Sequence, residues 1–201
     1  MTRIVAAILA GGDARRLGGI DKCLIPLAGR PLLAHLLDRL LPQVDSLALG
    51  ANGDPARFSA FAVPVLPDAR RGIGPLAGLA VSLSWATTVG ADALLTVPGD
   101  TPFIPPDLRR ALHPAPAVAV SNGRHHHLVA LWPVSWAASL DRYLSALPSD
   151  APRRAFGVLA FAATMPPMRE VRFGGADDPF FNLNTPDDRA RAECRAAREL
   201  S

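Results

Sequence analysis

The chain has 201 residues, of which 49% are apolar and 19% are charged, and its formal net charge is +3. This length suits one α/β domain, and the composition excludes a disordered protein. A weak positive charge without a basic cluster excludes a typical nucleic-acid groove and favours a small anionic ligand. No apolar run reaches 18 residues, so we expect no contact with a membrane and a cytoplasmic protein.

The first residues read as a strand rather than a secretion signal. The apolar run at residues 4–9 meets Gly11 and Gly12 almost at once, without a small-x-small cleavage site. The run is continuous and partly β-branched, which is typical of a strand buried on both faces of a parallel sheet. The two cysteines, Cys23 and Cys194, are too few for a disulfide scaffold, and we expect reduced thiols.

Strands and helices alternate through the next hundred residues. Leucines recur near the helical period after Pro31, and Pro42 ends that pattern. The other elements expected here are strands at residues 46–50, 63–66 and 93–97 and helices at residues 75–89 and 105–112. This alternation predicts a layered α/β fold with a mostly parallel sheet.

The pattern changes after residue 115. Asn122 and Gly123 separate two apolar runs, at residues 117–121 and 128–132, which is a hairpin signal. The remaining elements expected are helices at residues 136–147, 153–163 and 187–200 and a strand at residues 169–173. We therefore predict a single domain, 1–201, in two lobes: residues 1–115 and residues 116–201.

Three polar clusters follow predicted strands, at residues 11–22, at residues 68–78 and at Asp100. Ligands of open α/β sheets bind outside the carboxyl ends of the strands, so we expect these clusters to face one site. The first cluster holds four glycines, two arginines and a lysine, a combination suited to phosphates. It matches neither a Walker A loop nor a dinucleotide fingerprint, and a plain glycine turn with solvated arginines is the alternative.

Individual residues in the other clusters have specific chemistry. Gly74 and Pro75 open a helix whose free N–H groups suit an anion or a base edge. Asp100 directly follows a buried strand, where it is a natural Mg²⁺ ligand, although a turn or cap is the alternative. Asn182 and Asn184 share one side of an extended segment and suit a polar heterocycle or phosphate; an Asx-type turn is the alternative.

The three consecutive histidines at residues 125–127 invite a metal interpretation. Adjacent side chains on a strand point to opposite faces, so the three cannot share one ion. We expect instead a hairpin that carries one histidine facing the ligand.

Together these motifs resemble those of the nucleotidyltransferases with a Rossmann-like fold, and most closely the molybdenum cofactor guanylyltransferases. The similar motifs are Leu9-Ala-Gly-Gly…Arg16-Leu-Gly-Gly-Ile-Asp-Lys22, Gly74-Pro-Leu-Ala-Gly78, Asp100-Thr-Pro and Asn182-Leu-Asn-Thr-Pro186. The resemblance runs through nearly the whole chain. It implies a three-layer fold of the nucleotide-diphospho-sugar transferase type. It also implies transfer of GMP from GTP to molybdopterin, releasing pyrophosphate.

The resemblance also implies roles for residues. Arg16, Lys22 and Asp100 would be catalytic, with Asp100 on Mg²⁺, and Asn182, Asn184 and His126 would bind the acceptor in residues 116–201. The nucleotide in residues 1–115 would contact Leu9, Ala10, Gly11, Gly12, Lys22, Asn52, Asp68, Gly74, Pro75, Gly78 and Asp100. The family associates the glycine at position 11 with guanine. Transient contact with molybdopterin-delivering proteins and molybdoenzymes is implied as well.

Two positions depart from the family pattern. The family commonly has Asn-Ala-Asn after its second strand, whereas this chain has Gly50-Ala51-Asn52, and His127 stands where proline is usual. Arg153-Arg154 resembles a paired arginine only weakly. Transfer of a cytidylyl group, or transfer to a sugar phosphate, is the near alternative. A non-catalytic carrier of nucleotide or pterin is the alternative from another class, and pyrophosphate release separates the two classes.

Overall fold

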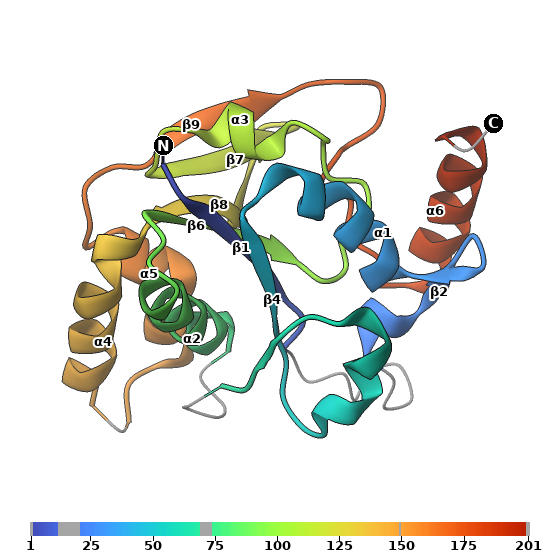
Figure 1. The fold of residues 1–201 in the computed structure, drawn as a ribbon. Helices are drawn as coiled ribbons and strands as arrows, with labels where there is room; N and C mark the ends of the chain where they lie inside the picture. The colour runs from blue at the N-terminus through green and yellow to red at the C-terminus, as the bar shows by residue number, and fades with distance from the viewer. Residues whose placement is uncertain (1, 12–20, 69–73, 149, 200–201) are drawn as a thin grey trace.

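The computed structural model describes residues 2–11, 21–68, 74–148 and 150–199. Its centre is a seven-stranded sheet with the strand order β5-β4-β1-β6-β8-β7-β9 (Figure 1). Of these strands, only β8 runs antiparallel to the others. The mostly parallel α/β sheet predicted from the sequence is confirmed. The strands are β1 (Ile4–Leu9), β4 (Ser46–Gly50), β5 (Val65–Leu66), β6 (Ala93–Pro98), β7 (Ala117–Ser121), β8 (Arg124–Pro133) and β9 (Arg169–Phe173).

Helices cover both faces of the sheet and make the three layers (Figure 1). Alternate side chains of β1 enter different cores, which explains its continuous apolar run. Ile4 and Ile8 pack with the helices α1 (Leu32–Leu40) and α3 (Leu108–Leu112). On the opposite face, Val5 and Ala7 pack with another set of helices. These are α2 (Pro75–Thr88), α4 (Ala137–Ala146) and α5 (Val158–Ala162).

The C-terminal helix α6 (Pro186–Glu199) is attached through a third, smaller core. Figure 1 shows α6 beside the short strand β2 (Pro26–Leu27), away from the central sheet. β2 pairs with β3 (Arg30–Pro31). The third core contains Leu27, Leu32, Phe103, Leu183, Ala192 and Ala196. This packing holds the segment before α6 next to the loop that follows β6.

Several element boundaries differ from the prediction. The hairpin strand β8 begins at Arg124 rather than at residue 128, because Asn122 and Gly123 both adopt positive φ and form a tight turn. The helical stretch at 153–163 is divided at Gly157 into a 3₁₀ segment, η6 (Arg153–Phe156), and α5. Only residues 65–66 of the expected strand 63–66 pair with β4. α3 begins at Leu108 rather than at residue 105.

The cysteines and the apolar helices were singled out in the sequence. Cys23 is buried, Cys194 is exposed, and both are free thiols. Among the described helices, none is long and apolar enough to cross a membrane.

Strands from residues 1–115 and from residues 116–201 share the one central sheet, with β6 paired to β8.

Candidate active site

The carboxyl ends of β1, β4 and β6 lie side by side and fix the loops that leave them. Main-chain bonds continue the ladder past the strands: Ala10 N donates to Gly50 O at 2.8 Å, and Gly99 N donates to Leu9 O at 3.0 Å. Ala51 N donates to Leu66 O at 3.1 Å. Gly11, Asn52, Asp68 and Asp100 therefore leave the sheet at one edge, as expected for a ligand site of an open α/β sheet.

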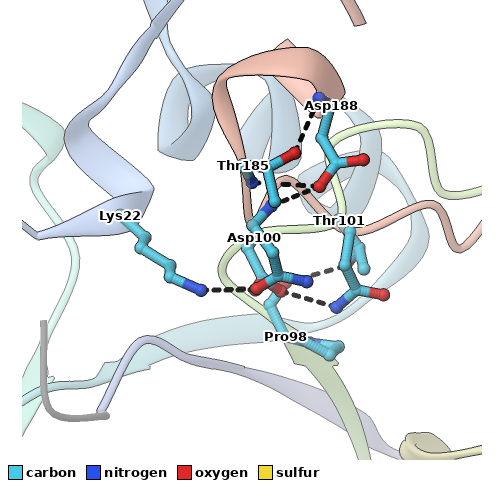
Figure 2. Close-up of polar contacts among 8 residues, drawn as sticks. Lys22, Pro98, Asp100, Thr101, Thr185 and Asp188 are labelled. Carbon is cyan, nitrogen blue, oxygen red and sulfur yellow. Dashed lines mark hydrogen bonds and ion pairs between the residues drawn. The ribbon is translucent and has the colours of Figure 1, made fainter. Parts of the chain in front are cut away.

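Asp100 is at the centre of a polar cluster at this edge. Its Oδ2 lies 3.6 Å from the Lys22 ammonium, and its Oδ1 accepts a hydrogen bond of 2.9 Å from the Asn182 amide. Lys22 Nζ also donates to Asn184 Oδ1 at 2.6 Å. Figure 2 shows Lys22 extending toward Asp100 from the left, on the side away from Thr185 and Asp188. The structure thus brings together Lys22, Asp100, Asn182 and Asn184, which are far apart in the sequence.

Backbone bonds hold this cluster in place. Leu183 N donates to Asp100 O at 3.0 Å, which fixes the segment bearing Asn182 against the loop after β6. Thr101 Oγ1 donates to Pro98 O at 2.8 Å and tightens that loop (Figure 2). The Asp100 side chain is 17% exposed and that of Lys22 is 34% exposed. Both charges are therefore accessible to a ligand while being held in one geometry.

The start of α6 is stabilised by a reciprocal cap that the sequence reasoning missed. Asp188 N donates to Thr185 Oγ1 at 3.1 Å, and Asp188 Oδ2 accepts from Asn184 N and Thr185 N (Figure 2). A hydrogen bond with the Thr185 side chain is the main cause that lowers the pKa of the Asp188 carboxyl, followed by the bond from Asn184 N. The signal was a Thr followed three residues later by an acid, which is typical of a capping box.

A second polar cluster lies at the ends of β1, β4 and β5. Asn52 Nδ2 donates to Asp68 Oδ2 at 2.6 Å, and Asp68 N donates to Asn52 Oδ1 at 2.9 Å. A Cβ atom on Gly11 would lie 3.6 Å from Asp68 Oδ2, and one on Gly78 would lie 3.8 Å from Asp68 Oδ1. The two glycines thus place no side chain against the Asp68 carboxylate. This amide–carboxylate pair suits the donor groups of a nucleobase.

Helix α2 begins next to this cluster. Gly74 adopts a φ of 69° at the N-cap, where a residue with a Cβ is strained, and Pro75 occupies the first turn. Pro75 has no N–H group and Ala77 N donates to Gly74 O at 3.1 Å, so this turn offers an anion fewer N–H groups than the sequence predicts. The predicted residues Gly12 and Arg16 lie outside the described residues. Leu9 and Ala10 lie at the site through the main-chain bonds given above.

His126 lies apart from the Asp100 cluster, in the interior. It is 9% exposed, its ring lies 4.8 Å from that of Phe180, and its Nε2 is 2.7 Å from Ser121 Oγ. The Ser121 hydroxyl donates to Asp178 Oδ1 at 2.7 Å, and Phe180 N donates to the same oxygen at 2.9 Å. The hydroxyl stands between imidazole and carboxylate, so this is not the order of a nucleophilic triad. The hydrogen bonds among His126, Ser121 and Asp178 connect β7 and β8 to the segment before Asn182.

The neighbouring histidines confirm the expected alternation along the strand. His125 and His127 share the outer face, with rings stacked 5.6 Å apart, and His125 Nε2 lies 2.8 Å from Glu170 Oε1. Burial lowers the pKa of His126 more than the Asp178 carboxylate raises it, so the ring is neutral near neutrality. In the part of the chain that is described, no group of three His, Cys, Asp or Glu side chains is placed to hold a metal.

Comparison with known proteins agrees with this geometry. A model of the MobA-like NTP transferase domain matches residues 6–160. A molybdenum cofactor guanylyltransferase of Acidiphilium cryptum is 51% identical over 189 residues, which covers 94% of this chain and 93% of that protein. The enzyme of the same name from Rhodobacter capsulatus is 45% identical over 196 residues, with 96% of each chain covered.

A solved structure has the same fold. It is the molybdopterin-guanine dinucleotide biosynthesis protein A of Archaeoglobus fulgidus, which superposes with a TM-score of 0.69 at 20% identity. The match covers 96% of this chain and 99% of that one. The domain model spans more than half of the chain, and the identity of the curated relatives extends over nearly all of it. The chain therefore belongs to the family of MobA-like NTP transferases.

Proposed function

We propose that the chain transfers GMP from GTP to molybdopterin, forming the molybdopterin guanine dinucleotide cofactor and pyrophosphate. The observation that carries this proposal is the cluster in which Asp100 meets Lys22, Asn182 and Asn184. It joins a phosphate-binding cation, a metal-binding carboxylate and two amides on the opposite lobe. The names of the curated relatives support the choice of guanine and of the molybdenum cofactor.

GTP occupies the edge formed by β1, β4 and β5 in this proposal. The guanine base lies against Gly11, Asn52 and Asp68, because the Asp68 carboxylate accepts hydrogen bonds from amino and imino donors. Gly74, Pro75 and Gly78 border the base at the start of α2. Gly11 places no side chain against the Asp68 carboxylate, where a Cβ atom would lie 3.6 Å from Oδ2. The base and the phosphates thus have separate sets of partners in residues 1–115.

The phosphates of GTP lie toward Lys22 and Asp100, with Arg16 as a further cation. The Asp100 carboxylate fits Mg²⁺, since this ion usually takes one or two carboxylates and completes its shell with substrate phosphates. Mg²⁺ bound there would neutralise phosphate charge. Lys22 stabilises the charge that develops on the leaving pyrophosphate, and Asn182 orients the Asp100 carboxylate.

The acceptor approaches from residues 116–201, where Asn182 and Asn184 face the Asp100 cluster. The terminal phosphate of molybdopterin attacks the α-phosphorus of GTP in line with the departing pyrophosphate. That phosphate is ionised near neutrality, so the chain needs no strong general base. Its contribution is positioning and charge stabilisation. His126 supports this side from within the core, through Ser121 and Asp178.

The reaction would take place in the cytoplasm. We expect transient contact with proteins that supply molybdopterin and with molybdoenzymes that receive the product. The relevant assay supplies purified molybdopterin, Mg²⁺ and either GTP or CTP, and counts pyrophosphate and dinucleotide product. We expect stoichiometric product with GTP alone. Activity with CTP alone would retain the chemistry and refute the choice of guanine. Tight GTP binding without pyrophosphate would favour the carrier alternative.

A further inference from the structure

Arg57 links the two polar clusters of the candidate active site. It belongs to the 3₁₀ helix η4 (Pro55–Phe61), and its guanidinium forms an ion pair with the Asp21 carboxylate. The same guanidinium donates to the main-chain carbonyls of Asn52 and Asp54. The Arg57 side chain is 27% exposed and that of Asp21 is 21% exposed. One cation therefore has three partners in a half-buried position, unlike a solvated surface pair.

The contact with Asn52 fixes the backbone of the base-binding cluster. The Asn52 carbonyl accepts from Arg57, while its side chain exchanges two hydrogen bonds with Asp68. The loop is shaped around the guanidinium at Gly53, which has a φ of 87°. A Cβ atom there would lie 3.2 Å from Arg57 Nη1. A displaced Arg57 would therefore release the loop that carries Asn52.

The contact with Asp21 concerns the phosphate side. Asp21 precedes Lys22 in the chain, and its carbonyl accepts from Leu24 N at 2.9 Å at the start of η2 (Lys22–Leu24). Without a counter-ion, the Asp21 carboxylate would repel an anionic ligand and compete for the Lys22 ammonium. Burial, together with Asp21, raises the pKa of Cys23 to about 12, and Arg57 acts against that rise. The charges of Asp21 and Arg57 thus oppose each other close to the Asp100 cluster.

We propose that Arg57 is a positioning residue for nucleoside triphosphate binding, which neutralises Asp21 beside Lys22 and fixes the Asn52 loop at the same time. The inference rests on the proposed function, because it assumes that the triphosphate spans the two clusters. It assigns to Arg57 no direct contact with the substrate. Its distinctive consequence is that the loss of GTP affinity on removing Arg57 comes partly from the negative charge of Asp21, which then has no counter-ion.

The test measures the dissociation constant of GTP by calorimetry, without acceptor, for the wild type and four variants. These are Arg57→Gln, Arg57→Lys, Asp21→Asn and the double variant Arg57→Gln/Asp21→Asn. Arg110→Gln is the matched control, because Arg110 pairs with Asp107 at 2.6 Å on the surface. We expect Arg57→Gln to weaken GTP binding about tenfold, the size expected for one lost charge-assisted hydrogen bond.

The remaining variants separate charge from structure. Arg57→Lys retains most of the GTP affinity, because it keeps a cation near Asp21. The double variant recovers most of the loss, and Asp21→Asn alone binds GTP at least as well as the wild type. In the pyrophosphate assay, Arg57→Gln raises KM for GTP more than it lowers kcat. Melting temperatures show whether each variant is folded. If Arg57→Gln is not folded, the GTP affinities of Asp21→Asn and Arg57→Lys still show whether the charge of Asp21 weakens GTP binding.

Two results would overturn the inference while leaving the proposed function intact. One is GTP binding by Arg57→Gln that equals binding by the Arg110→Gln control. The other is weaker GTP binding by Asp21→Asn with no recovery in the double variant, which would show a purely structural ion pair. Failure of the folded wild type to bind GTP would instead refute the proposed function, and this inference with it.

Discussion

The two sides of the candidate active site are held by different means. On the nucleotide side, Gly11 and Asn52 follow strands whose main-chain ladder continues past the strand ends. On the acceptor side, Asn182 and Asn184 lie in a segment outside the sheet, flanked by the carboxylates of Asp178 and Asp188. Backbone ladders do not titrate and survive most substitutions, whereas carboxylate networks depend on single side chains. The segment that carries Asn182 and Asn184 therefore depends more on single side chains than the strand ends do, whereas the Asn52 loop depends on the Arg57 side chain in the same way.

Asp100 is where the two sides meet, so its removal gives the largest expected effect. We expect Asp100→Ala to lower turnover by about 10²–10³-fold, the scale of losing one preorganised charge-stabilising group. The fold survives, because the main-chain bond between Leu183 N and Asp100 O is kept. Pyrophosphate release and the melting temperature measure the two quantities. Asp107→Ala, at an exposed ion pair, is the control. Near-normal turnover that depends on Mg²⁺ would remove Asp100 from the mechanism.

Lys22 tests the phosphate-binding cation, which also donates to Asn184 on the acceptor side. We expect Lys22→Ala to cost about 1–3 kcal/mol in kcat/KM for GTP, since a charge-assisted bond to phosphate is lost. Its effect on the melting temperature is small, because the side chain is 34% exposed. Steady-state kinetics with varied GTP provides the measurement. The control is Arg30→Ala, which removes a cation paired with Asp38 at 2.8 Å on the surface. An unchanged kcat/KM for GTP would contradict this role.

Thr185 tests whether the cap of α6 matters for the acceptor. Thr185→Ala removes the hydroxyl that accepts from Asp188 N, and loss of such a cap costs about 1 kcal/mol of unfolding free energy. We expect KM for molybdopterin to rise more than KM for GTP, because Asn184 immediately precedes the cap. Thr185→Ser keeps the hydroxyl and serves as the control. Equal changes in both KM values would show that the cap does not distinguish the two sides.

His126 gives the smallest effect, visible in the pH dependence of stability. Burial lowers the pKa of His126 in the folded chain below 6.5, the value for an ordinary histidine. Between the folded pKa and 6.5, the unfolded chain therefore binds more protons than the folded chain. Its contribution to stability is therefore fully present above pH 6.5 and is lost as the pH falls toward the folded pKa. Denaturant unfolding at several pH values should show a shallower pH dependence for His126→Asn than for the wild type. Parallel slopes for the wild type and His126→Asn would refute this.

Much of the nucleotide side was predictable, because local sequence carries its signals. A continuous apolar strand, a glycine-rich turn and a proline at a helix start each have a local physical cause, and they place Gly11, Gly74 and Asp100 at strand or helix ends. The strand-end rule then brings these residues to one edge. The prediction that His126 faces the ligand came instead from strand alternation and from the resemblance, which leave open what covers that face of the strand. Whether a strand residue points to solvent or to the core depends on what packs on that face, here Phe180.

The sequence by itself determined the layered fold, the parallel direction of the early strands and the amides available near the end of the chain. Hydrophobic periodicity and turn residues act over a few positions, so they can be read locally. Only the tertiary structure decided that Asn184 meets Lys22 and that Arg57 meets Asp21. Those contacts join residues up to 162 positions apart, and they follow from the packing of α6 and η4 rather than from any local pattern. Contacts between such distant residues depend on which faces of α6 and η4 are buried against the rest of the chain.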